Sequence, residues 1–335
     1  METYRHGAGR WLTRSLLGFV VATAMSVCSS ISRAEDITVT HWGAQFYGAP
    51  YAVAMEKGWF KSGNFDVTGI ITSTGGGTSL RNTLASPMPI GEVALPAVIE
   101  AMRAGAKLKM IYSGVGSVAE QVWATRLGEP YHSIQDLKGK RIGYTRPASV
   151  SNMLILMALE KSGIKASEVE LVAVGGVGAL LAAVQQGSIA AGNINEPLWT
   201  RDKDKLQKVF WFKDIMSPAM TQTVGITTEE FMNKRPDAIK AVVEGRLKGV
   251  RFIYEHPDEA ADIVSKLHKW DPAITRQVFA QLVKDKWWDQ GAFNFDGLNA
   301  MLNGMRLVGE FKGELDWATL IDERFLPADL KTIKK

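Results

Sequence analysis

Residues 133–144 read SIQDLKGKRIGY, and the stretches on both sides of them alternate between short apolar strands and helices. Residues 141–144 are predicted to form a strand, and residues 149–161 a helix that ends at Gly163. The alternation continues with a strand, a helix and a strand at 169–174, 182–186 and 189–194. Strands that alternate with helices in this way are typical of an α/β fold.

The chain before residue 133 follows the same scheme. Strands are predicted at 37–41, 65–73 and 93–95, helices at 51–57, 78–84 and 97–104, and extended segments at 108–115 and 122–125. Gly75-Gly76 and Gly175-Gly176 each follow a strand and open a helix, and a proline lies at a similar spacing beyond each pair. This echo indicates either duplicated strand-helix-strand units or a chance placement of glycine and proline.

The chain changes character after Glu229. Amphipathic helices are predicted there at 236–254, 258–267 and 274–283, and no clear strand pattern follows them. A chain of this length favours two lobes over one. We therefore expect a helical C-terminal tail that packs on one of the lobes.

The first 34 residues have the features of an export signal. Arginines precede an apolar run over 16–27, and Ser32-Arg33-Ala34 offers a cleavage site of the small-x-small type. The apolar run is too short to span a membrane as a helix. We therefore expect a cleavable signal peptide over 1–34 and a mature protein in the periplasm.

Removal of this leader changes the composition. It takes away Cys28, the single cysteine, so the mature chain would have no disulfide and no thiolate nucleophile. The leader holds four arginines and one glutamate, so 35 of the 39 basic and 34 of the 35 acidic side chains remain. The net charge falls from +4 to about +1. A nearly neutral chain gives no support for a nucleic-acid partner or an anionic membrane surface.

Candidate ligand contacts lie in loops that follow the predicted strands, where open α/β sheets bind ligands. These loops are 41–50, 74–79, 145–151 and 195–197. The helix starts at Thr78-Ser79 and at Ser149-Val150-Ser151 present backbone N–H groups to an anion. Each helix start is also compatible with an ordinary N-cap in a tight turn.

Three side chains in these loops are of particular interest. Trp42 and Tyr47 lie in the first loop, which contains Gly43 and Gly48, and are favoured as ligand contacts over the other aromatic residues. Glu196 follows an apolar strand and precedes Pro197, so it is predicted at the rim of a cleft. There it would accept a hydrogen bond from an amine or amidine, or serve as a cap or an interlobe salt bridge.

The sequence has few of the side chains that commonly act as nucleophiles, acids or bases in enzymes. His41, His132, His256 and His268 are dispersed and lack metal-binding spacing, and His41 alone is near the predicted cleft, without a partner nucleophile. We therefore expect no catalytic residue, no metal and no cofactor. The alternative is a secreted enzyme with His41 and Glu196 as acid and base.

Several motifs occur together in one family. They are Gly58-Trp59-Phe60, the segment 133–143, the helix end 159–164 and Asn195-Glu196-Pro197. With them the chain resembles, over about 37–260, the solute-binding proteins of bacterial ABC importers. The group it is most similar to serves aliphatic sulfonates, taurine, nitrate and thiamine-pyrimidine precursors.

The resemblance implies a two-lobed periplasmic-binding-protein fold of type II, with two crossovers near 121–123 and 223–227. Lobe 1 would span 35–121, lobe 2 would span 122–224, and 225–335 would return to lobe 1 and form the tail. The family's ligand contacts correspond here to Gln45, Phe46, Tyr47, Gly48, Gly76, Gly77, Thr78, Ser79, Ser149, Val150, Ser151, Asn152, Asn195 and Glu196.

The resemblance also implies a function. A monomeric receptor would capture a small polar or anionic organic solute between its lobes and deliver it to an ABC transporter permease, its only link to the membrane. The alternative enzyme on the same scaffold would act on a pyrimidine-like or a sulfonate or sulfinate substrate. The mature chain lacks the cysteines expected of such enzymes, which favours the receptor.

Overall fold

The computed structural model describes residues 33–41, 45–62, 65–73 and 75–333. Trp42 and the predicted signal peptide lie outside these residues, except for Arg33 and Ala34 at the start of the first strand. None of the helices in these ranges combines the length and the apolar character that crossing a membrane requires.

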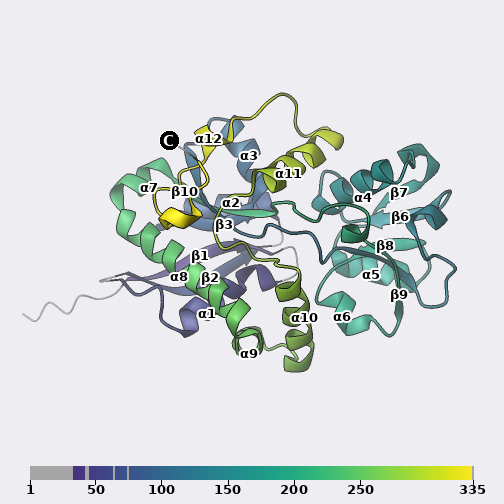
Figure 1. Ribbon diagram of the computed structural model, residues 1–335, viewed down its shortest axis with the longest axis horizontal. Helices are drawn as coiled ribbons and strands as arrows, with labels where there is room; N and C mark the ends of the chain where they lie inside the picture. The colour runs from purple at the N-terminus through teal and green to yellow at the C-terminus, as the bar shows by residue number, and fades with distance from the viewer. Residues whose placement is uncertain (1–32, 42–44, 63–64, 74, 334–335) are drawn as a thin grey trace, which may run out of the picture. The chain divides into compact units, whose positions relative to one another are not determined.

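Two five-stranded sheets organise the described chain (Figure 1). The first has the order β2-β1-β3-β10-β4, and we call the part built on it lobe 1. Its strands are β1 (Arg33–Thr40), β2 (Phe65–Ser73), β3 (Ile90–Ala94), β4 (Leu108–Ser113) and β10 (Thr223–Thr228). β1 is parallel to β2 and β3, whereas β10 is antiparallel to β3 and β4.

The second sheet has the order β7-β6-β8-β5-β9, and we call the part built on it lobe 2. Its strands are β5 (Val122–Arg126), β6 (Arg141–Tyr144), β7 (Glu170–Ala173), β8 (Ala191–Ile194) and β9 (Leu206–Trp211). β6 is parallel to β7 and β8, and β5 is antiparallel to β8 and β9. In each sheet, the fourth strand of the order given is antiparallel to both of its neighbours. This strand is β10 in lobe 1 and β5 in lobe 2.

The chain passes between the sheets twice. Residues 114–121 connect β4 to β5, and residues 215–222 lead from the short helix η4 (Phe212–Asp214) to β10. The crossover expected at 121–123 overlaps the first connection at Gln121 and continues into β5. The crossover expected at 223–227 begins directly after the second connection, in β10.

Helices flank both sheets. Those before the first crossover are η1 (Gln45–Gly48), α1 (Ala49–Glu56), α2 (Gly76–Ala85) and α3 (Leu95–Arg103). Lobe 2 carries η2 (Ile134–Leu137), α4 (Val150–Lys161), η3 (Ala166–Glu168), α5 (Val177–Gln185) and α6 (Leu198–Asp202). The segment SIQDLKGKRIGY spans η2 and β6, and a capping box in which Ser133 and Asp136 bond each other's backbone fixes the start of η2.

The C-terminal part is helical, as predicted. It comprises α7 (Glu229–Lys234), α8 (Pro236–Glu255), α9 (Pro257–His268), α10 (Pro272–Lys284), α11 (Phe295–Leu307), α12 (Trp317–Leu320) and η5 (Ala328–Leu330). The sequence reading did not identify α11, because Gly297 and Gly304 weaken its helical signal. Asn294 caps it by accepting hydrogen bonds from Asp296 N and Gly297 N.

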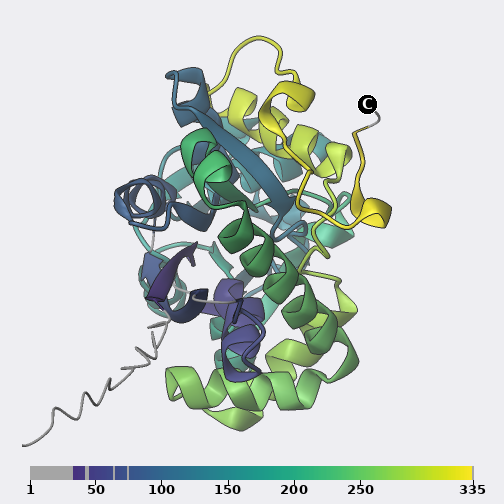
Figure 2. The ribbon, with the colours of Figure 1, turned by 90° about the vertical axis from the view of Figure 1, so that its left-hand side faces the viewer.

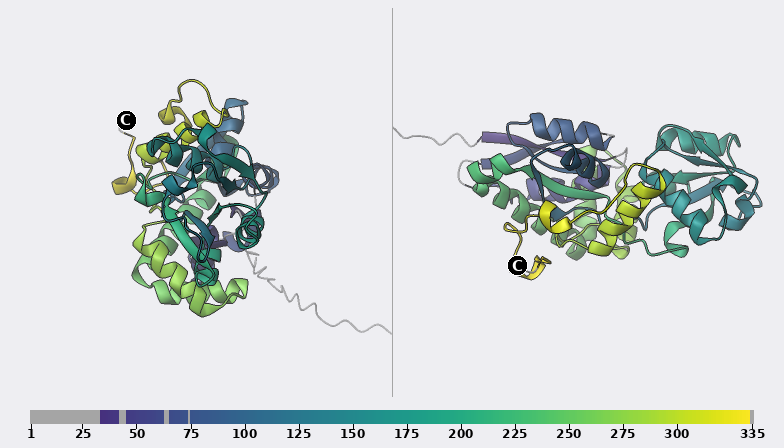
Figure 3. Two further views of the ribbon diagram at one scale, coloured as in Figure 1. Left: turned by 90° about the vertical axis from the view of Figure 1, so that its right-hand side faces the viewer. Right: turned by 90° about the horizontal axis from the view of Figure 1, so that it is seen from above.

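The tail contacts both lobes, which corrects the expectation that it packs on one. Helices α8 and α9 pack on α1 of lobe 1 (Figure 2). Helix α11 contacts α4 of lobe 2 (Figure 3), and α10 contacts α6. A glycine permits the α11 contact, because a Cβ added at Gly304 would lie 3.0 Å from Met153 Cβ.

Candidate functional site

A cavity of about 630 Å³ lies between the two lobes. Lobe 1 contributes Tyr47, Gly75 and Gly76 to its wall, and the two crossovers contribute Gln121 and Gln222. Lobe 2 contributes the loop 145–151, the glycine-rich run 175–178, Asn193 and the segment 195–198. The lining segments of lobe 2 follow β6, β7 and β8, so the cavity lies at the carboxyl ends of these parallel strands.

Three helices begin at this cavity. The N-caps of α2 and α5 are Gly75 and Gly176, and neither helix has a side-chain cap. At α4 the Ser149 hydroxyl caps the helix by accepting from Asn152 N at 3.3 Å. Helix N-termini favour negative charge because their first N–H groups lack intrahelical partners. The cavity is therefore suited to an anionic group at this end.

A cluster of hydroxyls holds the loop before α4. Thr145 Oγ1 lies 2.9 Å from both Ser149 Oγ and Ser151 Oγ. Asn152 Oδ1 accepts from Ala148 N at 3.1 Å, and Ala148 has a φ of 59°, which is unusual for a residue with a Cβ. These bonds place exposed Arg146 at the cavity, where it adds a positive charge beside the three helix starts.

Replacing Ser149 by alanine tests this arrangement. The substitution removes the cap of α4 and one member of the hydroxyl cluster, so we expect the free energy of unfolding to fall by about 1 kcal/mol. Denaturant unfolding of the two proteins measures the difference. An unchanged free energy would show that the loop does not depend on this cap.

Glu196 combines a structural contact with access to the cavity. Its carboxylate accepts from Thr200 N at 3.1 Å and from Thr200 Oγ1 at 3.0 Å, which corresponds to the cap anticipated as one of its roles. The side chain is buried and also lines the cavity. Burial raises the pKa of Glu196, and the two bonds from Thr200 oppose this rise. A carboxylate with two acceptor positions occupied retains capacity for a further donor.

A network of hydrogen bonds joins cavity-lining residues of both lobes through the two crossovers. Tyr47 OH donates to Gln222 Oε1 at 2.8 Å, and Gln222 Nε2 donates to Ser117 O at 2.6 Å and to Glu120 Oε1 at 3.2 Å. Gln121 Nε2 donates to the same Glu120 oxygen at 2.6 Å. Asn193 Nδ2 extends the network into lobe 2 by donating to Gln121 Oε1 at 3.1 Å.

The structure brings about half of the predicted ligand contacts to the cavity. Those that line it are Tyr47, Gly76, Ser149, Val150, Ser151, Asn195 and Glu196. Phe46 lines a much smaller adjoining cavity together with Tyr47, Asn195 and Glu196. Whether these residues bind a ligand stays a prediction.

The other predicted contacts have different places. Gly77 and Thr78 are exposed on α2, while Ser79 is buried and its hydroxyl lies 2.5 Å from Ser73 Oγ. Gly48 is the N-cap of α1, and Asn152 holds the 145–149 loop instead of lining the cavity. Gln45 begins η1, and Trp42 lies outside the described residues.

Several lining residues were missed from sequence. The pair Gly175-Gly176 echoes Gly75-Gly76 in the sequence but was not proposed as part of the site, although both glycine pairs line the cavity. That echo was the available signal. Gln121 and Gln222 carried no such signal, because only the return of the chain through the second crossover brings them together.

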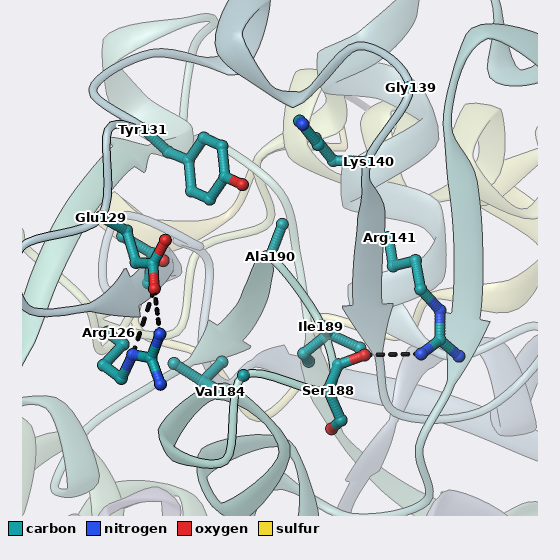
Figure 4. A pocket seen from close by; sticks show the side chains of 12 residues that line it. Arg126, Glu129, Tyr131, Gly139, Lys140, Arg141, Val184, Ser188, Ile189 and Ala190 are labelled. Carbon is teal, nitrogen blue, oxygen red and sulfur yellow. Dashed lines mark hydrogen bonds and ion pairs between the residues drawn. The ribbon is translucent and has the colours of Figure 1, made fainter.

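A second hollow, of about 370 Å³, lies in lobe 2 at the opposite strand ends (Figure 4). Its lining includes Arg126, Lys140 and Arg141, which makes it basic. Arg126 is already paired with Glu129, and Arg141 donates to Ser188 O at 2.6 Å. Only lobe 2 lines this hollow, whereas both lobes line the larger cavity.

The residues considered for enzyme chemistry, His41 and Glu196, do not line a common cavity. His41 is buried, burial lowers its pKa, and it lines neither of the cavities that Glu196 lines. Within the ranges that the structure describes, no three His, Cys, Asp or Glu side chains gather as metal ligands would. The acid and base pair of the alternative enzyme is therefore not assembled in one place.

Known proteins of similar fold include sulfonate-binding proteins and DszB. The periplasmic aliphatic sulphonate binding protein SsuA from Escherichia coli has a TM-score of 0.67 at 16% identity, with 86% of this chain and 97% of that chain covered. The alkanesulfonate-binding protein SsuA from Xanthomonas axonopodis bound to MOPS has a TM-score of 0.66 at 14% identity, covering 87% and 98%. A mutant of DszB in complex with biphenyl-2-sulfinic acid has a TM-score of 0.66 at 14% identity, covering 88% and 98%.

At the level of sequence, no curated protein is significantly similar to the chain. Residues 45–260 match the family described as NMT1/THI5 like, which is more than half of the chain. The two sulfonate-binding proteins share the fold of this chain, which has two lobes, each with a mixed five-stranded sheet, and a helical C-terminal part. The chain thus belongs to the NMT1/THI5-like family and has the type II periplasmic-binding-protein fold.

Proposed function

We propose that this protein is an extracytoplasmic receptor that captures a small polar solute between its lobes and delivers it to the permease of an ABC importer. One observation carries the proposal: the 630 Å³ cavity is lined by both lobes and by both crossovers. A solute held there contacts each lobe at once, so its binding energy stabilises the closed arrangement of a hinged protein. The similarity to sulfonate-binding proteins supports the same class of function.

The cavity suggests the chemistry of the solute. The N-termini of α2, α4 and α5 and the Arg146 side chain favour an anionic group. Glu196, on the β8 side, disfavours a simple anion and favours an N–H donor. A zwitterion or an amine-bearing heterocycle satisfies both ends, and we propose this class ahead of nitrate or a plain alkylsulfonate.

The predicted leader extends the proposal to location and partners. Cleavage after Ala34 would release a monomer into the periplasm, with the permease as its partner at the membrane. The enzyme alternative has precedent in DszB, which has this fold. The separation of His41 from the cavities lined by Glu196 is the observation that favours the receptor over an acid and base enzyme.

Mass spectrometry of the freshly purified mature protein tests the function. Denaturation should release a small zwitterionic or amine-bearing solute in an amount close to one per chain. Incubation of that solute with the stripped protein should return it chemically unchanged. A converted product would contradict the receptor and support the enzyme.

Replacing Glu196 by glutamine tests the proposed solute class. The substitution removes a charge-assisted hydrogen bond, so binding of an amine-bearing solute should weaken by about 1.5 to 3 kcal/mol. A purely anionic solute such as ethanesulfonate should bind equally well or better, because the buried negative charge is gone. Calorimetric titration with one solute of each class measures the difference, and an unaffected amine solute would remove Glu196 from the site.

A further inference from the structure

A buried carboxylate beside the large cavity has one oxygen that accepts no hydrogen bond of normal length from the described residues. Glu120 lies in the first crossover and is 3% exposed. Gln121 Nε2 and Gln222 Nε2 both donate to its Oε1 atom, at 2.6 and 3.2 Å. Its Oε2 atom is buried and accepts no hydrogen bond of normal length from the described residues, although the Trp287 side chain lies near enough to act on this carboxyl group. An ionised carboxylate is costly in this state, because a buried charge requires partners for both oxygens.

The surroundings of Glu120 form a small cavity. It has a volume of about 10 Å³ and is lined by Phe46, Tyr47, Glu120, Asn195, Glu196, Leu282 and Trp287. Tyr47, Asn195 and Glu196 also line the large cavity, so the two spaces adjoin. A volume of this size accepts one group as large as a water molecule.

The charges in this small cavity have one sign. Glu120 lies on the first crossover, Glu196 on the segment after β8, and Tyr47 on η1, and these are the titratable groups of the lining. The tail contributes Leu282 and the Trp287 ring, which carry no charge. None of the described lining residues is a lysine, arginine or histidine. Two carboxyl groups thus face a space the size of one small group that no described cationic side chain lines, and Lys203 acts on Glu196 from outside this lining.

We propose that Glu120 and Glu196 form a subsite for a primary ammonium group of the solute. This inference rests on the proposed receptor function and narrows its solute to a zwitterion whose anionic end lies toward the helix starts and Arg146. Glu120 Oε2 accepts one ammonium N–H, and Glu196 accepts another through its remaining acceptor capacity. A bulky quaternary ammonium group is excluded by the size of the cavity.

The protonation of Glu120 gives the subsite a pH dependence. Burial raises the pKa of Glu120 to about 7, while Gln121, Gln222 and Trp287 oppose the rise. Near neutral pH the empty protein therefore holds a proton on part of its Glu120 side chains. A bound ammonium favours the ionised carboxylate, so binding releases this proton, and affinity should rise as the pH increases from about 6 to 8.

Calorimetric titration with matched pairs of compounds tests the subsite. The pairs are taurine with ethanesulfonate, β-alanine with propanoate, and an aminomethylpyrimidine with the hydroxymethylpyrimidine of the same skeleton. We expect wild type at pH 8 to bind the amine member of at least one pair more tightly than its match. Glu120→Gln should weaken binding of that amine roughly 10- to 100-fold, the scale of a lost charge-assisted hydrogen bond.

Asp289→Asn is the matched control. Asp289 is also a buried carboxylate, its pKa is raised to about 6 by burial, and it accepts a hydrogen bond from Ser113 Oγ. It lines neither cavity, so its amide variant should keep the preference of wild type for the amine. Titration in two buffers of different ionisation enthalpy should show proton release in wild type near pH 6.5 and its loss in Glu120→Gln.

Thermal unfolding without solute shows whether Glu120 has only a structural role. A carboxyl group whose pKa is raised on folding costs the folded state stability as the pH rises from about 4.5 to 7. Glu120→Gln removes this cost, so its melting temperature should exceed that of wild type at pH 8 and approach it at pH 5. A variant less stable than wild type at both pH values would indicate that Glu120 mainly holds the crossovers together, which would overturn the subsite.

The outcomes separate the two proposals. If none of the six compounds binds wild type, the proposed solute class and receptor function are contradicted. If the amine-free members bind as tightly as the amines, the receptor stands and the ammonium subsite is wrong. If amines are preferred but Glu120→Gln binds them as wild type does, Glu120 is not part of the subsite.

Discussion

Arg246→Ala should destabilise the protein by about 3 to 5 kcal/mol, the largest effect that we expect from a single charged residue. The Arg246 side chain is fully buried and donates to Glu92 Oε2 at 2.8 Å, to Asp289 O at 2.9 Å and to Gly114 O at 2.8 Å. Its removal leaves the fully buried Glu92 without this cation and Asp289 O without the donor it has here, while Gly114 O keeps the hydrogen bond from Asp289 N. The loss therefore exceeds that of an ordinary hydrogen bond.

The cluster around Arg246 connects the parts that position the crossovers. Glu92 on β3 also accepts from Tyr51 OH on α1 and Thr223 Oγ1 on β10, both at 2.7 Å. Gly114 begins the first crossover, and Thr223 follows the second. We expect Arg246→Ala to loosen this junction as well as to lower global stability.

A surface ion pair provides the control for Arg246. Arg276 and Asp262 pair at 2.8 Å, and their side chains are 49% and 46% exposed. Arg276→Ala should lower the free energy of unfolding far less than Arg246→Ala does, because water screens and replaces this exposed pair. Urea unfolding of both variants gives the comparison. Similar losses for the two would show that burial does not set the energy of the Arg246 cluster.

Gly249→Ala should destabilise the protein by about 3 kcal/mol or more, through contact between two helix backbones. Gly249 lies on α8 where it crosses α1, and a Cβ there would lie 2.1 Å from Pro50 O and 2.9 Å from Pro50 C. The obstructing atoms are backbone, so no side chain can rotate away. The variant must move α8 from α1 or displace the start of α1, which follows η1 and Tyr47 directly.

The same substitution at an open position is the control. Gly178 lies near the start of α5, and a Cβ added there would meet no atom within 4 Å. Gly178→Ala should leave stability unchanged or raise it by up to about 1 kcal/mol, because alanine loses less backbone freedom on folding. Thermal unfolding of both variants measures the two effects. A neutral Gly249→Ala would contradict the close packing of α8 on α1.

The alternation of strands and helices was predictable because apolar spacing records which face of each element is buried. The strands at 65–73 and 141–144 have the predicted bounds, and α4 starts one residue after its predicted first residue, Ser149, which is its cap. Strand β9 and helix α11 were not identified. Gly297 and Gly304 dilute the helical pattern of α11, and Gly304 serves the contact with Met153, which local sequence does not reveal.

The residues of the candidate site were likewise predictable only in part. Residues at helix starts, such as Ser149 and Gly76, were proposed as ligand contacts because helix caps have a local signature, and both line the cavity. Glu120, Gln121 and Gln222 were not proposed, because their meeting depends on two chain crossings far apart in sequence. Thr78 and Ser79 were proposed with the same logic as Ser149, but the turn of α2 exposes one and buries the other.

Small-angle X-ray scattering can show whether both lobes bind the same solute. The solute identified by mass spectrometry would be removed by unfolding and refolding the protein, and then added back at saturating concentration. If both lobes bind the solute, the radius of gyration should fall when the solute is restored, because contacts to both lobes favour the closed arrangement. A radius of gyration that stays the same with and without bound solute would contradict binding of the solute by both lobes.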